Sequence, residues 1–137
     1  MKTFVVPYRQ ISDNSYLPMV WVRLGLQHEL LALVDTGASV NVLPHSVGLQ
    51  LGLDWNSSSD GPEIGGSIAG VSKKVKLLFK IRDFDALEME FCWLFHDRAR
   101  VILGHDDFLK NFDVCFSTCN RVFSITKSNV GLTIVGD

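Results

Sequence analysis

One stretch, Leu31–Leu43, constrains the fold more than any other part of the chain, because it sets a carboxylate between two apolar segments. Apolar residues occupy positions 30–34, Asp35 follows, and small residues fill 36–39 before the apolar pattern resumes at Val40. An ionised carboxylate that is buried without a partner costs many kcal/mol, so we expect Asp35 to be solvated or shared with another group. The pattern therefore predicts two buried strands that deliver one acid into a turn.

The residues behind Asp35 suit a tight and rigid turn. Gly37 favours a turn in which backbone approaches the acid or a ligand closely. Thr36 and Ser39 supply hydroxyl groups that fix loops through short local hydrogen bonds. Asp35 has an alternative interpretation as an ordinary turn aspartate, which its apolar flanks argue against.

Asp35-Thr36-Gly37-Ala38-Ser39, preceded by Leu33-Val34, resembles the active-site turn of aspartic proteases. A second element of that family, an apolar pair followed by glycine, has its counterpart in Val101-Ile102-Leu103-Gly104. The order and separation of the two elements resemble those of retropepsins, the half-size aspartic proteases of retroviruses and their cellular and bacterial relatives. The resemblance spans roughly Met19 to Phe116.

Composition limits the remaining possibilities. A chain of 137 residues with 47% apolar and 20% charged residues predicts one folded domain, residues 1–137, with a good core. A net charge of −2 without a basic run gives no basis for nucleic-acid binding, and no stretch approaches the roughly 20 apolar residues of a membrane span. Three cysteines, an odd number, fit a reducing compartment, so we expect a cytoplasmic protein.

Most of the chain is predicted to form strands. Met19–Gln27 alternates apolar and polar residues, and Gln27-His28-Glu29 is predicted to turn it into a strand ending at Val34. The further segments expected as strands are Thr3–Pro7, Val40–Leu43, Lys73–Ile81, Leu87–Phe95, Val101–Gly104, Asp113–Phe116, Arg121–Thr126 and Leu132–Val135. Turns or loops are expected at Ile11–Asn14, Asn56–Pro62, Asp83-Phe84-Asp85 and His96–Arg100. One short helix is predicted to start at Pro44 and to end near Gly52. A second is predicted to run through Asn111, with Asp106 or Asp107 as its cap.

Many short strands with one or two short helices predict an all-β fold, and the resemblance implies a small closed barrel of the retropepsin type with a flap hairpin. Glu63–Val71, with three glycines, is predicted to be a mobile hairpin tip that opens and closes over a cleft. In retropepsins this part of the chain forms the flap, and Ile64-Gly65-Gly66 resembles part of it. The alternative is an ordinary hairpin with a loose turn.

The resemblance implies a mechanism in which two carboxylates share one proton, because like charges about 3 Å apart do not both ionise. The signature occurs once, so the second acid is expected from another copy of the chain in a twofold homodimer. The catalytic turn implied is Asp35, Thr36 and Gly37. Thr36 is expected to cross-link the two turns, and Gly37 to permit their close approach.

The expected substrate is an extended polypeptide held between flap and turn, with hydrophobic residues at the cut. The residues expected to bind it are Ala38, Val42, Ile64, Gly65, Gly66, Ile68, Val101 and Ile102. Structural support of the site is expected from Ser39, Leu103 and Gly104. No metal and no cofactor is expected, since His28, His45, His96 and His105 lack zinc-ligand spacing and Cys115 and Cys119 lack further ligands.

Several features depart from the viral pattern or leave alternatives open. Viral members often carry an acid at the position of Ser39 and an arginine at that of His105, and both are absent here. A serine hydrolase triad would need a Gly-x-Ser-x-Gly elbow, which the chain lacks. The tail Lys127–Asp137 is a candidate for a dimer sheet. The sequence thus predicts a homodimeric aspartic endopeptidase, with a retropepsin-like binding or dimerisation module of little or no activity as the alternative.

Overall fold

The structure, a computed structural model, describes residues 2–127 and 135–136. In chain order its strands are β1 (Thr3–Pro7), β2 (Arg9–Ser12), β3 (Ser15–Leu17), β4 (Met19–Leu24), β5 (His28–Val34), β6 (Val42–Leu43), β7 (Ser59–Asp60), β8 (Ser72–Lys80), β9 (Leu87–Leu94), β10 (Val101–Leu103), β11 (Phe112–Ser117) and β12 (Val122–Lys127). Within these residues the helices are α1 (His45–Gln50), α2 (Phe108–Asn111) and a 3-10 turn, η1 (Gly66–Ile68). The all-β class expected from the sequence is confirmed.

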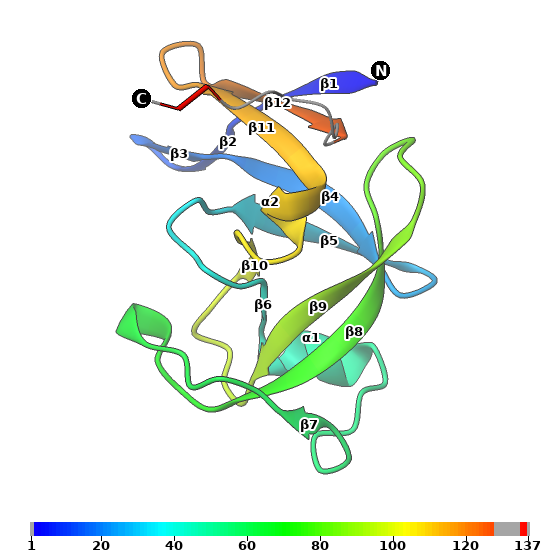
Figure 1. Ribbon diagram of the computed structural model, residues 1–137. Coiled ribbons are helices and arrows are strands. Elements are labelled where there is room, and N and C mark those ends of the chain that lie inside the picture. The colour runs from blue at the N-terminus through cyan, green and yellow to red at the C-terminus, as the bar shows by residue number, and fades with distance from the viewer. Residues whose placement is uncertain (1, 128–134, 137) are drawn as a thin grey trace.

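The main sheet closes into a barrel. Hydrogen bonds join its strands in the order β4-β5-β10-β6-β9-β8, and β4 pairs again with β8 through Arg23 and Leu24 (Figure 1). The antiparallel sheet β1-β12-β11 lies over one end of this barrel, while β7 extends the other end as an edge strand. The small closed barrel predicted from the sequence is confirmed. No helix in the described part of the chain is long and apolar enough to cross a membrane.

Period-two alternation builds the barrel core. On β4 the side chains of Val20, Val22 and Leu24 are buried, whereas Trp21 and Arg23 point outward to solvent. Burial removes apolar surface from water at about 25 cal/mol per Å², so this alternation fixes which face of the strand turns inward. Large aromatic side chains from β8 and β9 fill the centre, with Phe79, Phe91 and Trp93 fully buried.

Strand β4 ends earlier than the sequence pattern predicted. Gly25 has φ +67°, a left-handed conformation that glycine adopts without steric cost, so the chain turns at 25–27. The turn expected at Gln27-His28-Glu29 was therefore misplaced, because β5 already begins at His28. Leu26, the last apolar residue of the alternating segment Met19–Gln27, is 82% exposed at the tip of this turn.

Other boundaries differ by short segments. The loop expected over Asn56–Pro62 contains β7, which pairs with Lys73 and Lys74 of β8. The turn expected at Ile11–Asn14 is smaller, because β2 continues to Ser12 and pairs with β3. The strand expected at Leu132–Val135 and the dimer sheet expected from Lys127–Asp137 fall largely outside the described residues.

The helix predictions are confirmed in position but not in capping. Helix α1 follows Pro44, and Gly52, with φ +82°, comes directly after its C-terminal turn. Asp107 precedes α2, but its side chain makes no capping hydrogen bond to the helix. Its carboxylate instead accepts the backbone N–H of Glu90 on β9, so the expected cap is wrong.

Candidate active site

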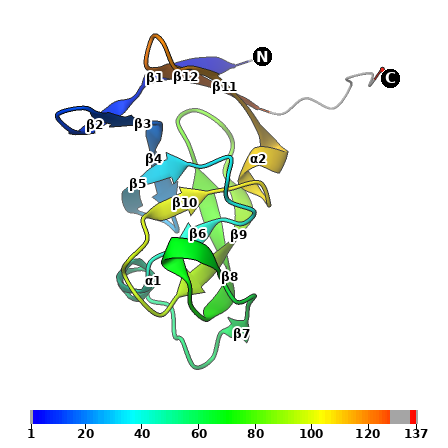
Figure 2. The same ribbon diagram turned by 90° about the vertical axis from the view of Figure 1, so that its left-hand side faces the viewer.

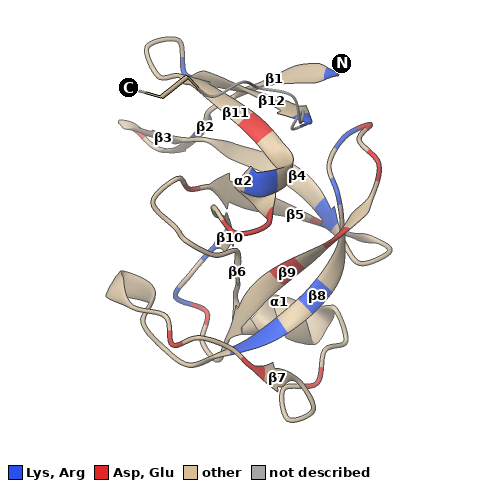
Figure 3. Cartoon of the chain, viewed as in Figure 1, with Lys and Arg blue, Asp and Glu red and all other residues tan. Residues whose placement is uncertain are grey.

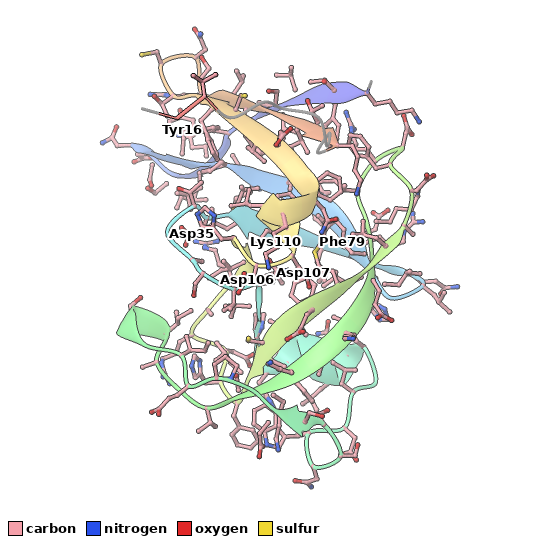
Figure 4. All side chains as sticks on the ribbon, in the orientation of Figure 1. Tyr16, Asp35, Phe79, Asp106, Asp107 and Lys110 are labelled. Atoms are coloured by element: carbon pink, nitrogen blue, oxygen red, sulfur yellow. The ribbon has the colours of Figure 1, made fainter. Side chains whose placement is uncertain are left out.

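Asp35 is placed by the backbone of two parallel strands. Its N–H, directly after the end of β5, donates to the carbonyl of Leu103 at the end of β10, with an N–O distance of 3.0 Å. The register pairs Val34 with Leu103, so β5 and β10 end at the same level. The side chain of Asp35 is half-buried at this edge (Figure 4). The structure thus places the acid in a turn directly after β5, beside the end of β10.

The turn that follows closes on its own carboxylate. The N–H of Gly37 donates to Asp35 Oδ1 at 2.8 Å, and the N–H of Ala38 donates to the Asp35 carbonyl at 3.1 Å. A Cβ atom at Gly37 would lie 3.2 Å from that same Oδ1, tighter than ordinary contact. Thr36 and Gly37 are exposed at the tip of the turn. Their exposure leaves room for a second molecule to approach the turn.

The segment after β10 supports the turn from behind. Gly104 is buried, and a Cβ atom there would lie 2.4 Å from the Val40 carbonyl oxygen and 2.7 Å from that of Ala38. The N–H groups of His105 and Asp106 donate to the carbonyls of Ala38 and Ser39 at 3.0 and 2.9 Å. The three residues expected as support therefore act through backbone: Ser39 and Leu103 by their carbonyls, and Gly104 by its lack of a side chain.

Sequence reasoning missed two residues that hold the turn. His105 Nε2 lies 2.7 Å from the Thr36 carbonyl, which only accepts, so Nε2 carries the hydrogen. Asn41, 1% exposed, accepts the N–H of Gly104 through Oδ1 and donates through Nδ2 to the Glu90 carbonyl. An asparagine between two valines is a signal of a buried polar group that needs partners.

A cavity of about 390 Å³ opens beside Asp35. Its walls bring together the turn, β6, β10 and the segment Glu63–Val71 (hereafter the arm). The lining residues are Asp35, Gly37, Ala38, Ser39, Val40, Val42, Pro62, Glu63, Ile64, Gly65, Gly66, Ser67, Ile68 and Ile102. This set contains all but one of the residues expected to bind substrate.

The exception is Val101, which packs into the barrel core. Successive side chains on a strand point to opposite faces, so Ile102 faces the cavity while its two neighbours face inward. Ile102 joins a second, smaller apolar cluster with the buried Val42 and Leu94, and Ile64 of the arm packs against them. Thr36 likewise does not line the cavity, although it adjoins Asp35.

The arm lies across the cavity from the turn. An antiparallel bridge between Ile64 and Gly70 closes it, and η1 forms its tip, seen below β10 in Figure 2. The β9–β10 loop anchors it: His96 Nε2 lies 3.1 Å from the Ile68 carbonyl, and Arg98 Nη2 donates to the Ala69 carbonyl at 3.0 Å. The arm is therefore held near the turn by side chains from outside its own hairpin.

The chemistry available in this cavity is that of carboxylates. Among the described residues, Asp35 and Glu63 are the acids that line it, and Glu63 is exposed on the arm. No group of three or more His, Cys, Asp or Glu side chains that could hold a metal ion occurs in the described part of the chain.

Cys92 lies outside this cavity, and its thiol is buried. Burial raises the pKa of this thiol, so it is a neutral group rather than a nucleophile.

Comparison with solved structures gives the class of fold. A retropepsin-like aspartic protease from Rickettsia conorii is similar over 90% of this chain and 91% of its own, with a TM-score of 0.67 and 15% sequence identity. The EIAV protease, solved with the inhibitor HBY-793, is similar over 74% of this chain and 92% of its own, with a TM-score of 0.56 and 21% identity. No family model matches the sequence, and neither does any curated protein.

The chain therefore has the retropepsin-like fold, as the sequence motifs predicted.

Proposed function

We propose that this protein is a homodimeric aspartic endopeptidase that hydrolyses peptide bonds in extended polypeptides. The observation that carries the proposal is the position of Asp35: its carboxylate sits in a turn fixed by backbone hydrogen bonds and lines a cavity walled by apolar residues. The turn holds the carboxylate at the wall of this cavity, where it can act on a peptide bound there.

The mechanism needs a second carboxylate next to Asp35. A twofold axis near the exposed tip of the turn would bring Asp35 of one protomer against Asp35 of its partner. Two such acids share one proton: the ionised one takes a proton from water, which attacks the scissile carbonyl, while the protonated one donates to the carbonyl oxygen. Proton transfer to the leaving amine completes the cleavage.

The remaining residues of the turn serve this arrangement. Gly37 N–H holds Asp35 Oδ1 in place, so the carboxylate does not have to be ordered when substrate binds. Thr36, at the exposed tip, is proposed to cross-link the two turns of the dimer. The arm is proposed to act as a flap, binding the backbone of an extended substrate from the side opposite the turn.

Substrate side chains would alternate between the faces of the bound strand. The apolar walls offered by Ala38, Val42, Ile64, Ile68 and Ile102 favour hydrophobic residues on either side of the cut. No metal or cofactor enters this mechanism.

The decisive experiment compares cleavage of a peptide library at mildly acidic pH by the wild type and two matched variants. Asp35→Asn keeps the shape of the side chain and the acceptor for Gly37 N–H, yet removes the carboxylate, so it should lose all cleavage. Glu63→Gln removes the other acid of the cavity and should retain cleavage. Equal activity of wild type and Asp35→Asn would refute the proposal, and loss of cleavage in both Asp35→Asn and Glu63→Gln would replace the dimeric dyad by an acid pair within one chain.

Sedimentation tests the dimer separately. Activity should appear at the protein concentrations at which the dimer forms, because each protomer contributes one acid. A monomer that still cleaves peptides would contradict the shared site.

A further inference from the structure

A larger cavity, of about 560 Å³, adjoins the candidate active site. The two cavities share Val40 and Pro62 in their walls, so they adjoin each other there. Charged side chains from β7, β8, β9 and the start of α2 surround the larger one: Asp60, Lys74, Glu90, Asp106, Asp107 and Lys110. In Figure 4, Asp106, Asp107 and Lys110 gather beneath α2, apart from Asp35.

Most of these charges already have partners. Lys74 Nζ lies 3.6 Å from Glu90 Oε1 across β8 and β9, where Figure 3 shows basic and acidic positions side by side. Lys110 Nζ lies 3.3 Å from Asp106 Oδ1. Asp60 accepts from Lys73 at 2.8 Å, and the pKa of this carboxyl is lowered by that hydrogen bond.

Asp107 differs from the other acids of this cavity. Within the described residues no Lys or Arg lies within ion-pair distance of its carboxylate. The carboxylate makes one hydrogen bond there, in which Oδ2 accepts the Glu90 N–H. The side chain is half-buried in the cavity wall. It therefore presents a negative charge, with Oδ1 left free, to whatever enters the cavity.

The backbone holds Asp107 in an unusual conformation. Its φ of +73° and ψ of −66°, with the Phe108 N–H donating to the Asp106 carbonyl at 3.2 Å, describe the rare γ-turn of positive φ. Residues other than glycine adopt this conformation at a cost of about 1–3 kcal/mol, and such strain is typical of functional positions. Here the turn directs the Asp107 side chain away from its helix and toward β9.

We propose that this cavity is an outer subsite of the peptide-binding cleft, which binds a lysine or arginine side chain of the substrate, with Asp107 as its anchor. The proposal rests on the proposed function, since it concerns the same extended peptide further from the cut. Four carboxylates line the cavity, and the ammonium groups of Lys74, Lys110 and Lys73 offset three of them, so the charge that remains is negative and favours a cation. A long basic side chain also suits the cavity, because its apolar stem could lie against Val40 and Pro62 while its charged end pairs with Asp107.

The arrangement predicts a substrate that carries both hydrophobic and basic side chains. Hydrophobic side chains would occupy the cleft beside Asp35, and a basic side chain would follow at the outer end. In a twofold dimer the cavity occurs at both ends of a continuous cleft, so basic residues on either side of the cut should favour binding.

The test measures binding without cleavage. The Asp35→Asn protein is titrated, by fluorescence anisotropy, with peptides of one apolar core in which a single residue, lysine or glutamate, is moved along the flanks. At one outer position lysine should bind about three- to fivefold more tightly than glutamate, the range of a partly exposed ion pair. Added salt should reduce this preference.

Two further substitutions, each made in the Asp35→Asn protein, test whether Asp107 causes the preference for lysine. Asp107→Asn retains the acceptor for the Glu90 N–H, and asparagine tolerates positive φ at least as well as aspartate, so the fold should persist and the lysine preference should disappear. Asp85→Asn, an equal change of charge at an exposed residue of the β8–β9 loop that does not line the cavity, should leave the preference intact.

Two outcomes overturn the subsite. Equal binding of lysine and glutamate peptides at every position would do so, and so would a lysine preference that survives Asp107→Asn. Either result leaves the proposed function standing if the wild type cleaves the same peptides. Absence of binding by all peptides, together with absence of cleavage by the wild type, would overturn both.

Discussion

The side-chain oxygen of Asn41 accepts the backbone N–H of Gly104 at 2.8 Å, 63 residues away in sequence. The amide nitrogen of the same side chain donates to the Glu90 carbonyl at 3.0 Å, and the Asn41 carbonyl accepts from Cys92 N–H at 2.8 Å. One buried residue thus joins the segment after Asp35 to both neighbouring strands. The position of the candidate catalytic turn depends on this junction.

Replacement of Asn41 by alanine should destabilise the protein strongly. The change leaves the buried N–H of Gly104 and the carbonyl of Glu90 without partners, at about 1–3 kcal/mol for each. We expect a loss of about 3 kcal/mol in the free energy of unfolding, measured by urea denaturation. A loss below about 0.5 kcal/mol would contradict the role assigned to Asn41.

Asn41→Asp should make stability depend on pH. The introduced carboxyl, when ionised, still accepts from Gly104 but turns its second oxygen to the Glu90 carbonyl, which repels it. Burial and this repulsion raise its pKa in the folded state above the unfolded value of about 3.9. The variant should therefore be closest to wild type in stability below that value and should lose stability as pH rises through the folded-state pKa. Urea denaturation across pH measures this, and a constant difference would contradict it.

Gly104→Ala tests the contact behind the turn. The added Cβ would lie 2.4 Å from a backbone oxygen of Val40, which has no flexible side chain to move aside. We expect a loss of about 3 kcal/mol in the free energy of unfolding, the upper end for overpacking. Gly65→Ala is the control, because φ there is −102° and a Cβ would meet nothing within 4 Å. Its stability should equal that of the wild type or exceed it slightly.

The sequence was sufficient for the fold because its strongest signals are local. The alternation on β4, the turn Asp35-Thr36-Gly37 and the apolar-Gly element Val101–Gly104 are each recognised from residues within a few positions of one another. Residues whose role depends on contacts far apart in the chain were not found this way. Asn41 is visible as a polar residue between valines, but nothing in the sequence states that Gly104 and Glu90 are its partners.

Asp107 shows a second reason why a role predicted from the sequence was wrong. An acid directly before a short helix is usually its cap, and that interpretation failed because a γ-turn rotates the side chain toward β9. Conformations of this kind cost energy locally and exist only where tertiary contacts impose them. Helix-capping propensities therefore do not predict the role of a residue in such a conformation.

Asp97 provides a prediction of pH-dependent stability. Its Oδ1 accepts the backbone N–H of Ser46 in the first turn of α1 at 2.8 Å, and this hydrogen bond lowers the pKa of the carboxyl below its ordinary value of 3.8. Because the folded-state pKa is lowered, its stabilisation is complete above pH 3.8 and is lost as pH falls through the folded value.

Asp97→Ala should therefore lower the free energy of unfolding near neutral pH by about 0.5–1 kcal/mol, a modest value because the carboxyl is exposed. The difference from wild type should shrink in acid, to what the neutral carboxyl still contributes as an acceptor. Urea denaturation over a pH series measures both, and Asp97→Asn, which keeps an acceptor for Ser46, should retain part of the stabilisation. A difference that is as large in strong acid as at neutral pH would contradict the assignment.

The anchoring of the arm by His96 and Arg98 predicts how easily it opens. Both side chains bond to carbonyls of the arm, whereas the amides of Ile64 and Gly70 bond to each other's carbonyls at 2.9 Å. Removing one anchor, an exposed hydrogen bond worth about 0.5–1.5 kcal/mol, should increase the opening equilibrium about three- to tenfold.

Arg98→Ala should accordingly speed hydrogen exchange of the Ile64 and Gly70 amides by that factor, while amides of the barrel strands keep their rates. Arg100→Ala, in the same loop, is the matched control: it removes the same charge from an exposed side chain that does not hold the arm, so the two amides should exchange as in the wild type. Exchange at the wild-type rate in both variants would show that Arg98 does not hold the arm, which would then depend on His96 and on the apolar contacts of Ile64 with Val42 and Ile102.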